Sequence, residues 1–190
     1  MTLNLTTEDR ALLSGGDGEA TALAMRILVS AAELLRARSL VQITSAHIDG
    51  CLYHGDGGVE FAETLVAAGG QVAVPTTLNV GALDLLHPGS VRADQSKTSM
   101  ARRQMDAYVS MGAQPTFTCA PYQIGHEPGV GEQIAWGESN AIAFANSVLG
   151  ARTERYGDFL DACCALTGRA PLYGLHIAKN REAKVVVDVT

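Results

Sequence analysis

Cys119 is the residue whose type and position most directly suggest chemistry. It ends a short run of β-forming residues within 115–122 (PTFTCAPY), and a proline follows two positions later. A cysteine at the end of a strand can supply a thiolate to a soft metal or act as a nucleophile. A lone cysteine is equally explained as a small buried side chain, because free cysteine is among the most buried residue types. The polar segments elsewhere in the chain favour the functional interpretation.

Three further polar segments could line a site together with Cys119. They are residues 47–56 (HIDGCLYHGD), 75–81 (PTTLNVG) and 136–141 (WGESNA). They follow predicted strands or lead into a predicted helix, and these are places where ligands meet side chains and backbone amides. Turns and helix caps also use such residues, so a purely structural role remains the alternative.

The candidate ligand-binding side chains in and beside these segments are of three kinds. His47 can transfer a proton or bond a substrate carboxylate, or it can be a loop histidine bonded to the backbone. Short hydroxyl and amide side chains orient ligands but also stabilise turns. The acid, hydroxyl and amide at the predicted helix start lie where backbone amides attract anions. The candidates are Ser45, His47, Thr76, Thr77, Asn79, Glu138, Ser139 and Asn140.

The elements that must position these residues alternate between helix and strand. Apolar periodicity predicts helices over 18–37, 56–68, 95–112, 138–148 and 157–167, and short apolar runs predict strands at 40–44, 72–74 and 116–118. The tail predicts two more strands, at 172–177 and 185–189, joined by a polar turn at 179–182. This alternation predicts an α/β domain with a mostly parallel sheet and packed helices.

The predicted topology brings the polar segments together. We expect the strands near 40–44, 72–74 and 116–118 to be neighbours in one sheet. Because sites in parallel sheets form beyond the carboxyl ends of the strands, the loops at 45–54, 75–81 and 119–123 should share a cleft with the helix start at 138–140.

Composition narrows the class of protein. The 190 residues suffice for one ordinary domain, and 47% are apolar. The net charge of −6 argues against a nucleic-acid partner, and no apolar run is long enough for a membrane span. The polar start lacks the apolar core of an export signal, so we expect a cytoplasmic protein with reduced thiols. Cys163 and Cys164 lie four positions after Phe159 and Leu160 in a predicted helix, which indicates burial.

Several segments of the chain carry a resemblance to a known family. They are residues 47–63 (HIDGCLYHGDGGVEFAE), 74–86 (VPTTLNVGALDLL), 119–123 (CAPYQ), 138–155 (ESNAIAFANSVLGARTER), and 167–171 (TGRAP) with 174–176 (GLH). Together they resemble the aconitase X family over nearly the whole chain. The resemblance implies an aconitase-like fold and an iron–sulfur hydro-lyase, in which a cluster iron acts as Lewis acid on the leaving hydroxyl of a small hydroxy acid.

The resemblance also implies a substrate and missing parts. Bacterial members with the HIDGCLYHGD form resemble cis-3-hydroxy-L-proline dehydratases, and archaeal members resemble mevalonate 5-phosphate dehydratase. Residues 1–190 correspond to the N-terminal half of the family's large portion. The other half and a small swivelling domain or subunit are expected to supply the catalytic serine and further cysteines. Cys119 matches a cluster ligand, and Cys51 is a less secure second one.

The expected consequence is that the chain is inactive on its own. The rival hypothesis is a non-catalytic small-molecule-binding module with the same pocket.

Overall fold

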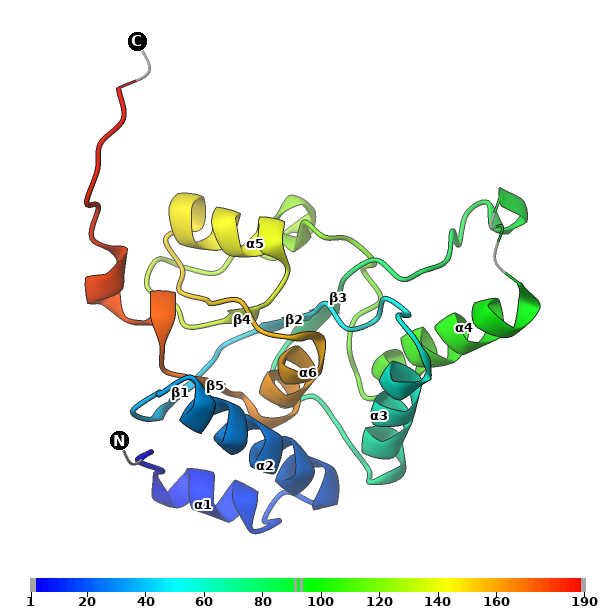
Figure 1. Cartoon of the computed structure of the whole chain (residues 1–190), viewed down its shortest axis with the longest axis horizontal. Helices are drawn as coiled ribbons and strands as arrows, with labels where there is room; N and C mark the ends of the chain where they lie inside the picture. The colour runs from blue at the N-terminus through cyan, green and yellow to red at the C-terminus, as the bar shows by residue number, and fades with distance from the viewer. Residues whose placement is uncertain (1–2, 91, 93, 189–190) are drawn as a thin grey trace.

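The computed structural model describes residues 3–90, 92 and 94–188. In this part, six α-helices pack around two small β-sheets, which is the predicted α/β class (Figure 1). The helices are α1 (Thr7–Leu13), α2 (Glu19–Leu34), α3 (Asp56–Ala67), α4 (Gln95–Ser110), α5 (Ser139–Phe144) and α6 (Asp158–Thr167). The strands are β1 (Leu40–Gln42), β2 (Ala46–Ile48), β3 (Thr76–Leu78), β4 (Ala135–Trp136) and β5 (Arg169–Pro171).

The three-stranded sheet is parallel and has the order β3-β2-β4, so β2 is its central strand. The register places His47 beside Thr77 on one side and Trp136 on the other. The second sheet consists of β1 and β5, which pair antiparallel. The prediction of a mostly parallel sheet with packed helices is therefore confirmed.

The two faces of the parallel sheet are covered by different helices. Figure 1 shows α5 and α6 on opposite sides of the sheet. Ala46 and Ile48 belong to the main core together with the buried cysteines of α6, whereas Trp136 belongs to a smaller cluster with Ala141 of α5 and Ala145 of the turn that follows it. Because side chains alternate along a strand, His47 lies on the same face as Trp136.

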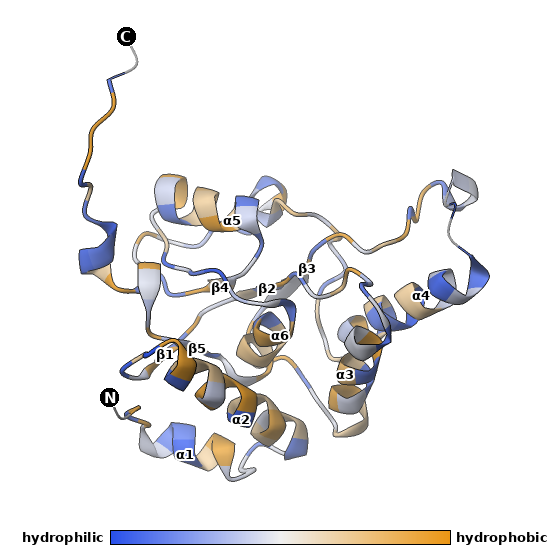
Figure 2. Ribbon diagram, viewed as in Figure 1, coloured by the Kyte–Doolittle hydropathy of each residue, from blue (hydrophilic) through white to orange (hydrophobic). Residues whose placement is uncertain are grey.

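The predicted helices are confirmed, because long amphipathic patterns define them. In α2, small and aliphatic residues such as Ala24, Leu28 and Ala32 are fully buried against α6. Figure 2 shows hydrophobic residues along most of α2, whereas α4 is mixed. The predicted helix over 138–148 is α5 followed by a π-helical turn, Ala145–Leu149. None of the described helices is long and apolar enough to cross a membrane.

The prediction that three strands lie side by side in one sheet is wrong. The strand near 40–44 is β1, which belongs to the other sheet. Residues 72–74 lead up to β3, which begins at Thr76, directly after a proline that lacks an N–H. Residues 116–118 run beside Leu78, whose carbonyl accepts from Thr118 N at 3.3 Å, but Phe117 has a φ of 44° and interrupts any strand there.

The strands predicted in the tail are also wrong. Residues 172–177 contain a 3₁₀ turn, Gly174–His176, and a second one, Ala178–Arg181, follows. Val185, Val186 and Val187 form no strand and are 75–90% exposed, in a segment that extends away from the body (Figures 1 and 2). Val189, the last predicted strand residue, lies outside the described residues.

Candidate functional site

The carboxyl edge of the parallel sheet carries a group of polar side chains. Asp49 follows β2, Asn79 follows β3, and Glu138 follows β4 after one glycine. The Asn79 side-chain amide donates a hydrogen bond to the Asp49 carboxylate, and Asn79 is buried. Burial raises the pKa of Asp49, and the nearby carboxylates of Asp158 and Glu138 raise it further, against the opposing effect of Asn79. A half-buried carboxyl group with a raised pKa is suited to proton transfer.

Asp49 was not among the candidates that the sequence predicted. The signal for it was its place between the apolar Ile48 and Gly50, because a carboxylate directly after a buried strand faces the sheet edge.

Cys119 lies next to the start of α5 and the end of β3. Its thiol is exposed. Its backbone carbonyl accepts from the Asn140 amide at 3.4 Å, and the Tyr122 hydroxyl donates to the Asn140 oxygen at 3.1 Å. The preceding residue bonds the end of β3, so Cys119, Asn79 and Asn140 come from adjoining segments at this edge.

Glu138 and Ser139 act mainly on the helix itself. The Glu138 carboxylate caps α5 by accepting from Ala141 N at 2.9 Å. It also accepts from the Ser139 hydroxyl at 3.0 Å. Glu138 thus accepts from a backbone amide in the first turn of α5. The sequence predicted that the amides of this turn would be available to an anionic ligand.

His47 was expected in a loop after a strand, but it lies within β2 and is fully buried. Its Nδ1 atom is 2.8 Å from the Thr77 hydroxyl oxygen. Burial and, to a smaller extent, the nearby His126 lower the pKa of His47 to about 4. The neighbouring Thr76 points to the other face, where its hydroxyl donates to the Val74 carbonyl at 2.8 Å.

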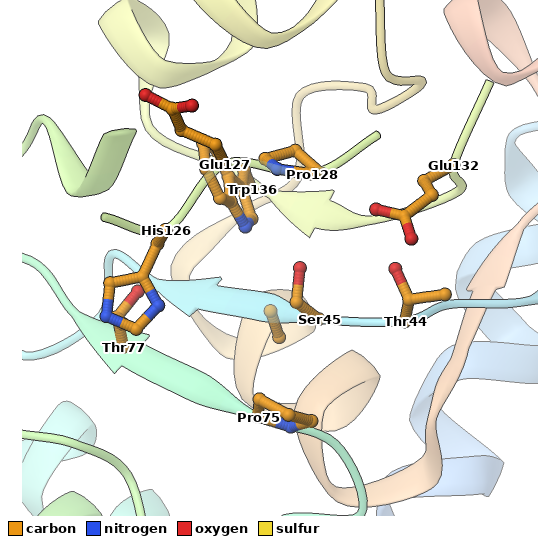
Figure 3. A pocket seen from close by; sticks show the side chains of 10 residues that line it. Thr44, Ser45, Pro75, Thr77, His126, Glu127, Pro128, Glu132 and Trp136 are labelled. Carbon is orange, nitrogen blue, oxygen red and sulfur yellow. The ribbon is translucent and has the colours of Figure 1, made fainter. Parts of the chain in front are cut away.

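A second polar feature is a cavity of about 200 Å³ on the α5 side of the sheet (Figure 3). Ser45, directly before β2, and Thr77 of β3 line it on one side, and Trp136 lies across from them. His126 and Glu132 close it from the adjacent loop. In Figure 3 the Ser45 hydroxyl points toward the Trp136 indole. The indole Nε1 is buried and has no hydrogen-bond partner among the described residues. This cavity could not be predicted from the sequence, because three separate segments form it.

The candidates therefore divide into two groups. Asn79, Glu138, Ser139 and Asn140 lie at the carboxyl edge with Cys119, whereas Ser45 and Thr77 line the cavity and His47 lies behind Thr77. Of the expected loops, 75–81 and 119–123 adjoin the helix start at 138–140. Ser45 precedes its strand and does not belong to that edge.

The described residues do not fit a complete iron–sulfur cluster. Such a cluster is held by several thiolates. Cys51, Cys163 and Cys164 are buried, and burial raises the pKa of Cys51 and Cys163 to about 12, so they remain thiols. Cys51 also donates to the Asn79 carbonyl at 2.8 Å. No group of three or more His, Cys, Asp or Glu in this part of the chain could hold a metal ion. Of the four cysteines, Cys119 alone is exposed.

The fold is that of an aconitase-type α/β domain. The solved structure of Thermococcus kodakaraensis aconitase X in its holo-form superposes with a TM-score of 0.84 and 39% identity, over 95% of this chain and 45% of that one. Residues 2–179 match the family described as Aconitase X first domain, and the chain belongs to the aconitase X family.

Curated relatives carry two names. The cis-3-hydroxy-L-proline dehydratase of Pseudomonas aeruginosa is 51% identical over 181 residues, covering 95% of this chain and 31% of the relative. The enzyme of the same name from Hypocrea jecorina is 48% identical over 189 residues, which is 32% of its length. The phosphomevalonate dehydratase large subunit of Thermococcus kodakarensis is 41% identical over 190 residues, covering 97% of this chain and 46% of the relative. The chain thus spans a third to a half of these relatives.

Proposed function

We propose that this chain is the N-terminal part, residues 1–190, of the catalytic domain of an iron–sulfur hydro-lyase that dehydrates cis-3-hydroxy-L-proline. The observation that carries the proposal is the 51% identity over 95% of the chain to a dehydratase of that name. The identity to a phosphomevalonate dehydratase large subunit is lower, at 41%. The remaining large portion and a small swivelling domain or subunit complete the enzyme, and the four free cysteines support a reducing cytoplasm.

The polar carboxyl edge gives this chain a role in that reaction. Dehydration removes the proton at C2 and the hydroxyl at C3 of the substrate, which leave as water, and the product is a pyrroline carboxylate. Asp49, whose pKa burial raises, is placed to hold or move a proton at its carboxyl oxygen. The amides of Asn79 and Asn140 orient Asp49 and the Cys119 segment.

The cluster belongs to the complete protein. Cys119 would be one of its ligands, and the others come from outside this chain, because the three remaining cysteines here are buried. His47 and Thr77 shape the sheet behind the site, and Ser45 lines the adjoining cavity.

The test compares this chain with the complete protein. The complete protein consists of this chain and the portions that the longer relatives contain in addition, either fused to the chain or added as a separate polypeptide. Both are reconstituted anaerobically and analysed for iron, sulfide and turnover of cis-3-hydroxy-L-proline and of phosphomevalonate. We expect a cluster and hydroxyproline dehydration from the complete protein and neither from the isolated chain. Turnover of phosphomevalonate alone would overturn the substrate assignment, and ligand binding without turnover would favour the binding module. Turnover by the isolated chain would overturn the assignment as a part.

A further inference from the structure

Asp161 is a completely buried carboxyl group in α6, directly beneath the carboxyl edge of the parallel sheet. Its Oδ2 atom accepts a hydrogen bond from the backbone N–H of Asp49 at 3.4 Å. Its Oδ1 atom has no hydrogen-bond partner among the described residues. A buried carboxyl group that is only half satisfied is costly, so its presence calls for a function.

The same carboxyl group touches the end of β4. A Cβ atom added to Gly137 would collide with both carboxyl oxygens of Asp161, so the Gly137 backbone lies in close contact with this carboxyl group. Position 137 therefore requires the absence of a side chain, because only glycine permits this approach. One side chain thus contacts the ends of two strands, at Asp49 and at Gly137.

The surroundings disfavour the ionised form of this acid. Asp49 faces it from the end of β2, Asp158 from its own helix, and Arg155 from the segment before that helix. Glu138 directly follows Gly137, the glycine that Asp161 contacts. Burial raises the pKa of Asp161 well above its usual range, the Asp49 and Asp158 carboxylates add to this, and the Asp49 amide and Arg155 oppose it. The buried thiols of Cys163 and Cys164 and the phenols of Tyr108, Tyr156 and Tyr173 bring no positive charge.

We propose that Asp161 is a positioning residue, whose neutral carboxyl group joins the ends of β2 and β4 and so fixes Asp49 relative to residues 138–140. The proposal rests on the proposed function, because the dehydratase reaction gives Asp49 its task. Asp161 does not reach the substrate and acts through the two strand ends.

The first experiment uses the complete protein with Asp161→Asn, Asp161→Ala and the matched control Asp106→Asn, which changes an exposed acid of α4. Asparagine keeps the shape and neutrality of the protonated acid, so kcat should stay within about threefold of the unmodified protein. Alanine removes both contacts, so kcat should fall about 10²-fold while KM changes much less, as expected for a displaced catalytic group. Asp106→Asn should behave like the unmodified protein.

Two results would overturn the proposal. If Asp161→Asn lost as much kcat as Asp161→Ala, the ionised carboxylate would be required. If folded Asp161→Ala kept full kcat, Asp161 would have no positioning role. Should the alanine variant fail to fold, the asparagine variant still decides between the neutral and the ionised form.

The second experiment tests the contact without any activity. Gly137→Ala should lower the unfolding midpoint. The double variant Gly137→Ala/Asp161→Ala should lose less stability than the sum of the losses of the two single variants, because the new methyl group no longer meets a carboxyl group. Infrared spectra should show a protonated carboxylic acid that Asp161→Asn removes and Asp106→Asn keeps. Additive stabilities and an unchanged infrared band would refute the contact and the neutral acid. If the complete protein lacked turnover but passed this second experiment, the proposed function would fail and the contact would stand.

Discussion

The Nδ1 atom of His47 lies 2.8 Å from the hydroxyl oxygen of Thr77, and this hydrogen bond links the central strand of the parallel sheet to its neighbour. Both side chains are buried. The other ring nitrogen of His47 has no partner among the described residues, so Thr77 provides the only side-chain hydrogen bond recorded for this imidazole. The polar pair therefore links β2 and β3 through one side-chain hydrogen bond beside the cavity that Thr77 lines.

Removal of the Thr77 hydroxyl should destabilise the protein. Thr77→Val keeps the shape of the side chain but leaves the buried imidazole unsatisfied, so the free energy of unfolding should fall by about 1–3 kcal/mol. Thr77→Ser keeps the hydroxyl and should lose less. Urea unfolding at pH 7.5 measures both changes, and an unchanged midpoint for Thr77→Val would show that the bond contributes nothing.

Two buried histidines should each reduce the stability of the protein as the pH is lowered from about 6.5 to about 4. Burial lowers the pKa of both His47 and His176 from the ordinary 6.5 to about 4. Between these values the unfolded chain binds protons that the folded chain does not, so the free energy of unfolding decreases with falling pH. Each histidine can contribute up to about 3 kcal/mol over this range.

Urea unfolding at half-unit pH steps measures this loss. His54, which is exposed, supplies the control: His54→Gln should leave the pH dependence unchanged. His176→Gln should reduce the slope, because one of the two titrating groups is gone. The raised pKa values of Asp49 and Asp161 act in the opposite direction, so the contribution of the histidines is measured by comparison with the variant. The same slope in His176→Gln as in the unmodified protein would contradict the prediction.

The long helices could be predicted from the sequence and the short strands could not. Repeated apolar positions over three or more turns define α2, α3 and α4. The strands of the parallel sheet have only two or three residues, and β2 contains a histidine, so no alternating pattern marks them. Their pairing depends on long-range hydrogen bonds, such as that from Ala46 N to the Pro75 carbonyl at 3.0 Å.

The candidate site was predictable where a polar residue follows a strand or opens a helix. Asn79 and Asn140 are examples, since their positions in the sequence place them at the sheet edge. Asp161 was not predictable, because an acid in the first turns of a helix usually faces solvent or caps the helix. Its burial follows from the close packing of α6 against β2 and β4, which no local pattern encodes.

The buried ion pair between Arg169 and Asp9 should hold α1 onto β5. The arginine Nε donates to the Asp9 carboxylate at 2.8 Å, and Asp9 is only 2% exposed. Arg169→Leu leaves this carboxylate buried and without its cation, so the free energy of unfolding should fall by about 3 kcal/mol or more. The same arginine also pairs with the exposed Glu8 at 3.0 Å, and Glu8→Gln should cost less than about 1 kcal/mol. Equal losses of unfolding free energy from Arg169→Leu and Glu8→Gln would contradict the burial assigned to the pair of Arg169 and Asp9.

Cys119 should be the one thiol of the native chain that reacts with a water-soluble alkylating reagent. It is exposed, whereas Cys51, Cys163 and Cys164 are buried. Burial raises the pKa of Cys51 and Cys163 to about 12, so their thiolate forms are scarce at pH 8. Mass spectrometry should find one modification per native chain and four after unfolding in urea.

The matched variants and the complete protein then connect this reactivity to the cluster. Cys119→Ser should abolish the native modification, and Cys163→Ser should leave it unchanged. In the complete protein, anaerobic reconstitution should protect Cys119 from alkylation, because a cysteine bound to iron cannot attack the reagent. Rapid labelling of Cys119 in a protein that holds stoichiometric iron and sulfide would exclude it as a ligand.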